Sequence, residues 1–135
     1  MKKDWLFESY RKNQSKFSCE IEDEWDLAMD VNIKGCFLGA RAVVPAMREA
    51  GWGRIVNIAS AHGLTASPYK SAYVTAKHGV IGLTKTIGLE TAREAITCNA
   101  ICPGYVSTPL VEAQIPDTMK EYGMSREEVI EKVLL

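Results

Sequence analysis

The stretch Ser60–Gly79, SAHGLTASPYKSAYVTAKHG, decides how the rest of the chain is interpreted. Tyr73 and Lys77 are four residues apart within it, so on a helix they lie on the same face, one turn from each other. The apolar run RIVNIAS ends at Ser60 and is typical of a buried strand. The stretch therefore predicts a strand that ends in a serine, then a loop, then a helix that carries a tyrosine and a lysine on one face.

These three side chains have the chemistry of a proton-transfer site. A phenol titrates near pH ~10 in isolation, and a neighbouring ammonium favours the phenolate. Tyr73 beside Lys77 is therefore predicted to exchange a proton with an alcohol, while the Ser60 hydroxyl hydrogen-bonds the same oxygen. Taken alone, a Tyr-x-x-x-Lys pair is also common as surface decoration, and the spacing by itself leaves that alternative open.

Helices and strands alternate around this stretch. Residues 22–50 have apolar side chains at helical spacing and predict a long helix that contains Asn32 and is bent or interrupted at Pro45. Gly51-Trp52-Gly53 is expected to end that helix. The next elements are predicted as a strand at 54–59, a loop at 60–70, and a helix at about 72–92 with Ser71 as its N-cap.

A second strand is predicted at residues 96–102, ITCNAIC, with a Pro103-Gly104 turn at its carboxyl end. Residues 109–124 predict a short helix and a mobile loop, and Ser125-Arg126-Glu127-Glu128 is a capping-box start for a last helix. Both predicted strands are near-continuously apolar, as parallel strands covered on both faces are. The fold class expected is therefore α/β with a parallel sheet, whose site lies at the carboxyl ends of the strands.

The composition is that of a soluble globular protein. The 135 residues suffice for one domain with a core, and a net charge of −1 gives no reason to expect a nucleic acid or an anionic membrane as partner. No apolar run has the length of a membrane span, and the first residues lack the apolar region of a secretory signal, so a cytoplasmic protein is expected. No metal site is expected, and the cysteines, none in a C-x-x-C pair, are expected to be reduced thiols: Cys19, Cys36, Cys98 and Cys102.

Four residues in this order resemble the short-chain dehydrogenase/reductase family: Asn32 in DVNIKGCF, Ser60, Tyr73 and Lys77. The resemblance implies an oxidoreductase in which these four residues are catalytic. Tyr73 would exchange the proton, Lys77 would assist it and bind the nicotinamide ribose, and Ser60 would position the reacting oxygen. Asn32 would hold a water in the proton path. For Asn32 alone, a satisfied amide in the core or in an interface is the alternative.

The segment CPGYVSTPL is similar to the P-G-x-V-x-T turn of the same family. The resemblance implies that this turn contacts the nicotinamide, with the Thr108 hydroxyl on its carboxamide. NAD is the cofactor expected, and NADP stays open because the segment that discriminates them is absent. Without the upstream match, a Pro-Gly pair followed by polar residues is simply a loop. The cofactor-binding residues implied are Tyr73, Lys77, Pro103, Gly104, Val106 and Thr108.

The resemblance covers residues 21–135 and corresponds to the second half of a family member. The chain has no G-x-G-x-x-G or T-G-x-x-x-G-x-G turn for a pyrophosphate, no acidic residue placed for an adenosine ribose, and no N-N-A-G segment. We therefore expect a partial Rossmann-like, doubly wound parallel sheet whose first βαβ unit is missing. Such a chain, a fragment or a shortened relative, is expected to be poorly stable alone. Residues 1–20 stay unassigned.

Three further residues narrow the substrate expected. His62 lies two residues after Ser60, Lys70 lies just before the catalytic helix, and Gln114 lies in the predicted mobile loop. In the family, these matches imply a clamp for the carboxylate of a small 3-hydroxy acid, which is oxidised to the 3-oxo acid. A desolvated carboxylate needs such donors. Each of the three taken alone is more often a solvated loop side chain.

Two alternative functions stay open at this point. A reductase of 3-oxoacyl thioesters from the same family would share the four core residues and would not need the carboxylate clamp. A non-catalytic remnant would only associate with other subunits. The family implies a homo-oligomer, a tetramer, formed through the helices at 22–50 and 72–92.

Overall fold

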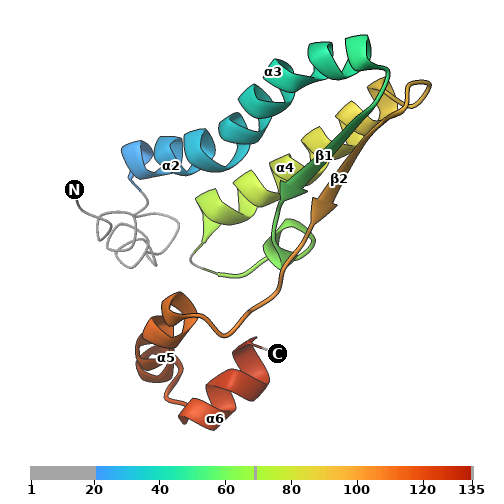
Figure 1. Cartoon of the computed structure of the whole chain (residues 1–135). Coiled ribbons are helices and arrows are strands. Elements are labelled where there is room, and N and C mark those ends of the chain that lie inside the picture. The colour runs from blue at the N-terminus through green and yellow to red at the C-terminus, as the bar shows by residue number, and fades with distance from the viewer. Residues whose placement is uncertain (1–20, 69, 135) are drawn as a thin grey trace. The chain divides into compact units, whose positions relative to one another are not determined.

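The computed structural model describes residues 21–68 and 70–134 (Figure 1). Cys19 and the unassigned segment 1–20 lie outside the described residues. The chain divides after Cys102 into two compact units, Met1–Cys102 and Pro103–Leu135. The parallel sheet belongs to the first unit.

A long helix opens the described part of the first unit, as the sequence predicts for residues 22–50. Its parts, which follow one another in Figure 1, are α2 (Glu22–Met29), the π-helical segment η2 (Asp30–Lys34) and α3 (Gly35–Ala50). The π geometry appears in the hydrogen bond that the Gly35 N–H donates to the Asp30 carbonyl, five residues back. Pro45 lies inside α3, and the helix continues past it. Gly51 ends α3 with a φ of 68°, which glycine adopts without strain.

Two parallel strands and the helix between them form the rest of this unit. Within the described residues, β1 (Gly53–Ile58) pairs with β2 (Ile96–Ile101) in a two-stranded sheet, with Gly53 opposite Ile96. The connection includes the short 3₁₀ helix η3 (Ala61–Gly63) and the 20-residue helix α4 (Ser71–Glu90). Parallel strands need such a crossover because the chain must return from the carboxyl end of the first strand to the amino end of the second, at the opposite end of the sheet. Figure 1 shows α4 running alongside both strands.

The core of the first unit lies between α4 and one face of the sheet. Ala76 and Val80 on α4 are fully buried, and Ile96 and Cys98 on β2 are buried too. The Asn57 amide on β1 donates a 2.9 Å hydrogen bond to the Thr84 hydroxyl on α4, so this buried polar group is satisfied. The core is therefore built largely of small side chains, with one polar link between helix and strand.

The other face of the sheet is exposed in this chain. Val56 and Ile58 of β1 and Ile101 of β2 are each more than half exposed. The expectation that both faces of the strands are covered is therefore wrong for the residues that the structure describes. Their apolar sequence indicates a face that needs a cover, but the described helices pack on one side only.

Two helix boundaries also differ from prediction. Lys70 is the N-cap of α4 and Ser71 is its first residue, so the prediction of Ser71 as N-cap is wrong by one position. The structure ends α4 at Glu90 and places both strands within a residue or two of their predicted bounds. Such shifts are ordinary, because helix and strand ends depend on capping geometry.

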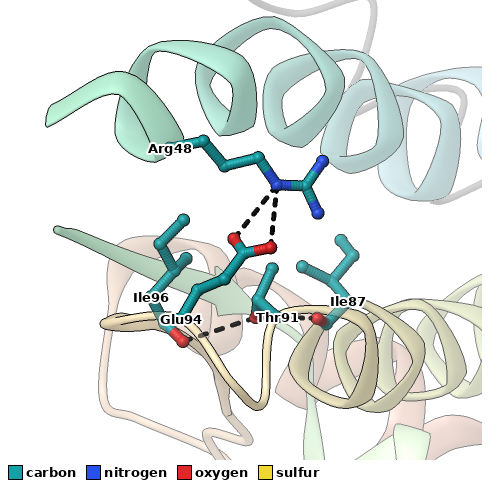
Figure 2. Close-up of polar contacts among 5 residues, drawn as sticks. All are labelled: Arg48, Ile87, Thr91, Glu94 and Ile96. Atoms are coloured by element: carbon teal, nitrogen blue, oxygen red, sulfur yellow. Dashed lines mark hydrogen bonds and ion pairs between the residues drawn. The ribbon is translucent and has the colours of Figure 1, made fainter. Parts of the chain in front are cut away.

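A small polar network joins the end of α3 to the connection between α4 and β2 (Figure 2). The Arg48 Nε donates to both carboxylate oxygens of Glu94, at 3.1 and 3.0 Å. The Thr91 hydroxyl lies 2.9 Å from the Ile87 carbonyl and 3.3 Å from the Ile96 carbonyl. The Arg48–Glu94 pair is solvent-exposed and contributes little, whereas Thr91 is almost completely buried. Thr91 is therefore the member of the network that matters for stability.

The second unit contains the helices α5 (Pro109–Tyr122) and α6 (Arg126–Val129) and the π-helical segment η4 (Ile130–Leu134). Thr108 caps α5, because its hydroxyl accepts a hydrogen bond from the Val111 N–H, and Pro109 follows at the first helical position. The mobile loop predicted within 109–124 is wrong: α5 continues to Tyr122 and ends at Gly123. The predicted capping box is confirmed, with Ser125 and Glu128 each bonding the other's backbone N–H.

None of the helices within residues 21–68 and 70–134 combines the length and the apolar content that a membrane crossing requires.

Replacing Thr91 with valine should lower the free energy of unfolding by about 1–2 kcal/mol, because a buried carbonyl loses a hydrogen-bond partner while the side-chain shape is kept. Urea denaturation of the chain measures this. The matched control is Thr86→Val within α4, the helix that Thr91 follows, where an exposed hydroxyl makes the same type of bond to the Gly82 carbonyl. The control should change stability by less than about 0.5 kcal/mol. Equal losses in both variants would contradict the interpretation.

Candidate active site

Ser60 lies directly after the carboxyl end of β1, where the chain turns toward α4. It is buried, with 7% of its surface exposed. Its Oγ accepts a 3.1 Å hydrogen bond from the backbone N–H of His62, so Ser60 caps the short helix η3. A serine whose oxygen accepts from the backbone keeps its own proton for another acceptor. The turn therefore presents a fixed hydroxyl at the strand end.

Tyr73 and Lys77 project from the first turns of α4 toward the same place. The Lys77 Nζ lies 5.6 Å from the centre of the Tyr73 ring, which confirms the prediction that the two share a helix face. The Lys77 Nζ also donates a 3.0 Å hydrogen bond to the Ile58 carbonyl at the end of β1. The ring of His62 meets the ring of Tyr73 edge-on, with centroids 6.2 Å apart. The structure thus brings Ser60, His62, Tyr73 and Lys77 together from three elements.

Burial shifts the pKa of two of these groups. Burial lowers the pKa of the Lys77 ammonium from its ordinary value, and a negative charge on the Cys36 sulfur acts in the opposite direction. Burial also lowers the pKa of the His62 imidazole, and the charge of Lys70 acts in the same direction. His62 is therefore held in its neutral form to a lower pH than an exposed histidine. A neutral imidazole carries one N–H donor and one acceptor nitrogen.

Asn32 lies in the π-helical segment η2, which packs against α4. Its Nδ2 donates a 2.9 Å hydrogen bond to the Ala28 carbonyl, one turn back. Ile33, the next residue, lies so close to Gly79 of α4 that a side chain at position 79 would collide with it. The half-buried Asn32 is thus fixed next to the helix that carries Tyr73 and Lys77. Single-turn π segments within α-helices are frequent at functional sites.

The remaining predicted residues are placed locally. Lys70 is the half-buried N-cap of α4, three residues before Tyr73. Pro103, Gly104 and Val106 are exposed in the extended segment before α5, and Thr108 caps that helix. Gln114 lies half-buried in α5, not in a loop. Lys70 belongs to the first unit. The residues of the 103–108 segment and Gln114 belong to the second unit, and the prediction that they approach Ser60 and Tyr73 stays a prediction.

The sequence did not indicate two neighbours of Lys77. One is the backbone carbonyl of Ile58, which has no signature in a sequence because every residue carries one. The other is the thiol of Cys36, which the sequence suggested only as a reduced cysteine. Cys36 is three residues beyond Ile33, on the helix that packs on α4, and helical spacing was the signal that could have indicated it. Among the described residues no cluster of metal-ligating side chains occurs.

The arrangement can transfer a proton to or from an oxygen held near the end of β1. In such a transfer, Tyr73 would supply the exchangeable proton, Lys77 a positive charge beside the ring, and Ser60 a second hydrogen bond. A family model described as short chain dehydrogenase matches residues 11–118 of this chain. The chain belongs to the short-chain dehydrogenase family. The match begins within residues 1–20, to which the sequence pattern alone assigns no role.

Relatives of known name give the same family. The chain is 55% identical over 124 residues to a D-beta-hydroxybutyrate dehydrogenase of Rhizobium meliloti, which covers 89% of this chain and 48% of that protein. It is 45% identical over 113 residues to a D-beta-hydroxybutyrate dehydrogenase of Cupriavidus necator, with 84% and 44% covered. A 3-oxoacyl-[acyl-carrier-protein] reductase of Thermotoga maritima is 40% identical over 105 residues, with 78% and 42% covered. The chain spans about half the length of these curated relatives.

Solved structures agree on the fold. Sorbitol-6-phosphate 2-dehydrogenase from Erwinia amylovora superimposes with a TM-score of 0.80 at 31% identity, covering 85% of this chain and 46% of that one. A variant of actinorhodin polyketide ketoreductase, solved with NADPH, gives a TM-score of 0.77 at 37% identity, with 86% and 45% covered. The described α/β elements with their parallel strands are thus part of a Rossmann-type dehydrogenase fold, as the sequence predicts.

The lowered pKa of His62 predicts how stability depends on pH. Below the ordinary value near 6.5, an unfolded chain takes up a proton that folded His62 does not. The contribution is present above that value and is lost as the pH falls below it. The free energy of unfolding should therefore decline between about pH 7.5 and pH 5.5, on either side of the ordinary histidine pKa.

Urea denaturation at several pH values measures this decline. In His62→Gln the decline should be smaller, while His78→Gln on the exposed side of α4 should keep the wild-type slope. An unchanged slope in His62→Gln would refute the assignment.

Proposed function

We propose that this chain supplies the catalytic part of an NAD-dependent dehydrogenase that interconverts D-3-hydroxybutyrate and acetoacetate. The observation that carries the proposal is the convergence of Ser60, Tyr73 and Lys77 at the carboxyl end of β1, with His62 against the tyrosine ring. The identity of 55% to a D-beta-hydroxybutyrate dehydrogenase supports the choice of substrate. Since the chain spans about half of that relative, the activity is assigned to the completed protein.

Tyr73 acts as the general acid and base in this proposal. As phenolate, it takes the proton from the substrate hydroxyl, and in the reverse direction it returns a proton to the carbonyl oxygen. Lys77, with its Nζ close to the ring, stabilises the phenolate through its positive charge. Ser60 donates its hydroxyl proton to the reacting oxygen and fixes its position. The Lys77 Nζ already lies 5.6 Å from the centre of the Tyr73 ring, and Ser60 follows directly after the strand whose end that Nζ contacts.

Asn32 is proposed to support the proton path behind Lys77. Its amide group is fixed by the bond from Nδ2 to the Ala28 carbonyl, and its Oδ1 can accept a hydrogen bond from a water. The π segment around it interrupts the regular helix next to α4 and leaves backbone groups out of the usual ladder. Such groups can hold a water that connects the lysine to solvent.

The residues present fit a nicotinamide cofactor. The Lys77 ammonium has three donors and gives one to the Ile58 carbonyl, so two remain for the hydroxyls of a ribose. The Thr108 hydroxyl accepts from the Val111 N–H and can donate its own proton to a carboxamide oxygen. The exposed backbone at Pro103, Gly104 and Val106 would hold the other side of that group. When bound, the nicotinamide accepts or returns the hydride.

The substrate carboxylate is assigned to His62, Lys70 and Gln114. The ring of His62 meets the ring of Tyr73, and the charge of Lys70 acts on the His62 pKa, which supports assigning both residues to one carboxylate. A carboxylate of a small 3-hydroxy acid would find one charged and two neutral donors there. Gln114, in the second unit, would complete the set.

NAD is preferred over NADP on the resemblance alone, and one similar ketoreductase was solved with NADPH.

Two other functions have some support. The 40% identity to a 3-oxoacyl-[acyl-carrier-protein] reductase favours a thioester substrate without a carboxylate clamp.

Exposed apolar side chains on the first long helix favour subunit association, with or without catalysis. We propose a homo-oligomer through the helices at 22–50 and 72–92; the exposed residues concerned are Val31, Phe37, Leu38 and Val43.

The 135-residue chain by itself should show no NAD-dependent oxidation of D-3-hydroxybutyrate. The reason is that its sequence has no glycine-rich turn for the cofactor pyrophosphate, so the binding energy that would place the nicotinamide is missing. The absorbance of NADH, followed with the purified chain at high protein concentration, measures this. Clear turnover would show that the site functions without such a turn.

A chimera tests the catalytic assignment. It joins this chain to the part of the Rhizobium meliloti dehydrogenase that the chain does not match, with the parent enzyme as positive control. In this chimera, Tyr73→Phe should abolish turnover while NADH binding, followed by fluorescence, survives, because the phenyl ring keeps the packing and loses only the proton-transfer group. Tyr105→Phe, which also removes one phenolic hydroxyl, is the matched control and should stay active. Near-normal turnover in Tyr73→Phe would mean that another group transfers the proton.

The carboxylate clamp is tested in the same chimera with Lys70→Ala and Gln114→Ala. A charge-assisted hydrogen bond contributes roughly 1.5–3 kcal/mol, so each change should lower kcat/KM for 3-hydroxybutyrate by about tenfold to a hundredfold. The loss for the uncharged methyl ester should be much smaller, because both residues are proposed to contact the carboxylate and not the reacting carbon. The loss in Lys70→Ala should also shrink in high salt. If acid and ester lose equally, the clamp is refuted and the thioester reductase becomes the better assignment.

A further inference from the structure

We infer that Gly63 is a positioning residue for the proposed reaction: because it has no side chain, the turn from Ser60 to Gly63 rests directly on the backbone of Lys77. This contact would hold the Ser60 hydroxyl and the His62 ring against Tyr73. The meaning of the contact for catalysis rests on the proposed function, while the contact itself rests on geometry.

The space around Gly63 is closed by the helix that carries the site. Gly63 is buried, and a Cβ built on it would lie 2.8 Å from the Lys77 carbonyl oxygen, 3.1 Å from the Lys77 carbonyl carbon and 2.8 Å from Cδ1 of Ile81. Cβ atoms do not approach other heavy atoms within 3.0 Å. The Ile81 methyl is the end of a side chain and can rotate away. The Lys77 carbonyl belongs to the backbone of α4 and cannot move without bending the helix.

The requirement at Gly63 is steric and not conformational. Among the described residues the glycines with positive φ are Gly51 and Gly123, so Gly63 has a backbone conformation that alanine can adopt. An alanine at position 63 would therefore keep the local backbone preference and lose only the close approach to α4. Any effect of that substitution reports the contact with Lys77 and Ile81.

The turn is also held by Lys77 at a second point. The Lys77 Nζ bonds the Ile58 carbonyl, two residues before Ser60, while the Lys77 backbone contacts Gly63, three residues after it. Between these points the Gly63 N–H donates to the Ser60 carbonyl at 2.9 Å, and the His62 N–H donates to the Ser60 Oγ. The segment is short and internally bonded. A displacement at Gly63 must therefore be passed on to Ser60 and His62.

The imidazole of His62 reports the position of this turn. Burial and Lys70 lower its pKa, and it lies edge-on to Tyr73. The sequence contains two histidines, so their ring proton signals can be followed separately by NMR, with His78 on α4 as the internal reference. The signal does not require cofactor, substrate or activity. It would be insensitive to a general loss of stability as long as the chain is folded.

The experiment compares the 135-residue chain with Gly63→Ala and with the matched control Gly82→Ala. Gly82 lies on α4, and within the described residues nothing approaches the position of its Cβ within 4 Å. In Gly63→Ala the His62 titration should move up toward that of an exposed histidine, and the contact between the His62 and Tyr73 rings should weaken in the nuclear Overhauser spectrum. Gly82→Ala should titrate as the wild type does. A wild-type His62 titration in Gly63→Ala would overturn the inference.

A double variant separates the backbone contact from side-chain packing. Gly63→Ala with Ile81→Ala removes the methyl clash and keeps the clash with the Lys77 carbonyl, so the His62 titration should stay shifted relative to Ile81→Ala alone. A titration matching Ile81→Ala would overturn the inference, because packing would then explain the effect. If Gly63→Ala does not fold, the double variant decides. If Gly63→Ala and the double variant both fail to fold while Gly82→Ala folds, the inference is overturned as well. The contact would then be needed for the fold and not for positioning.

Activity in the chimera adds an independent readout. There, Gly63→Ala should lower kcat on the order of a hundredfold, as expected when a reacting group is misplaced by about 1 Å, with Gly82→Ala near the wild type. If the chimera is inactive with its native Gly63, the proposed function is rejected. The His62 titration in the 135-residue chain then decides whether Gly63 positions the turn. A shifted titration with unchanged kcat would overturn the catalytic meaning of the contact.

Discussion

Lys77 joins the two halves of the candidate site, and the arrangement of the other residues depends on that link. Its ammonium holds the end of β1 through the Ile58 carbonyl, and its backbone supports the turn at Gly63. Between these two contacts lies the serine, and one helical turn before the lysine lies Tyr73. Besides this residue, the Asn57–Thr84 hydrogen bond is the polar link described between β1 and α4, and apolar packing, which is not directional, supplies the rest of their contact. One residue thus fixes a hydroxyl, a phenol and a positive charge relative to one another.

The parts of this site that could be predicted from sequence are those set by local geometry. The spacing of Tyr73 and Lys77 fixes their common face because α-helical periodicity does not depend on the rest of the fold. Gly51 after a helical pattern and the capping box at Ser125 are similarly local, and the structure has both. The end of the apolar run at Ser60 placed the serine correctly at the strand end. Each of these predictions rests on a pattern within one helix or strand and the residues next to it.

Other features depended on contacts between distant segments and could not be predicted. The π segment around Asn32 contains no glycine or proline that would mark it in the sequence. It packs closely on α4 where Ile33 meets Gly79, two residues that are far apart in sequence. The sequence predicted a short helix and a mobile loop over residues 109–124, yet Pro109 occupies the first turn of α5, where its missing N–H costs nothing, and the helix accommodates Pro116. The apolar strands suggested cover on both faces. Which face is covered depends on what packs there, and an apolar pattern alone does not say.

The order in which the site can assemble follows from the crossover. Gly53 of β1 pairs with Ile96 of β2, about forty residues later in the chain, so the strands can meet only after a long loop has closed around α4. Tyr73 and Lys77 become neighbours as soon as α4 forms, since helix formation is local and fast. The serine joins them only when β1 docks on that helix. A partly folded chain would therefore already have Tyr73 and Lys77 on the same face of α4. Ser60 would join them only in the slow, non-local step of folding.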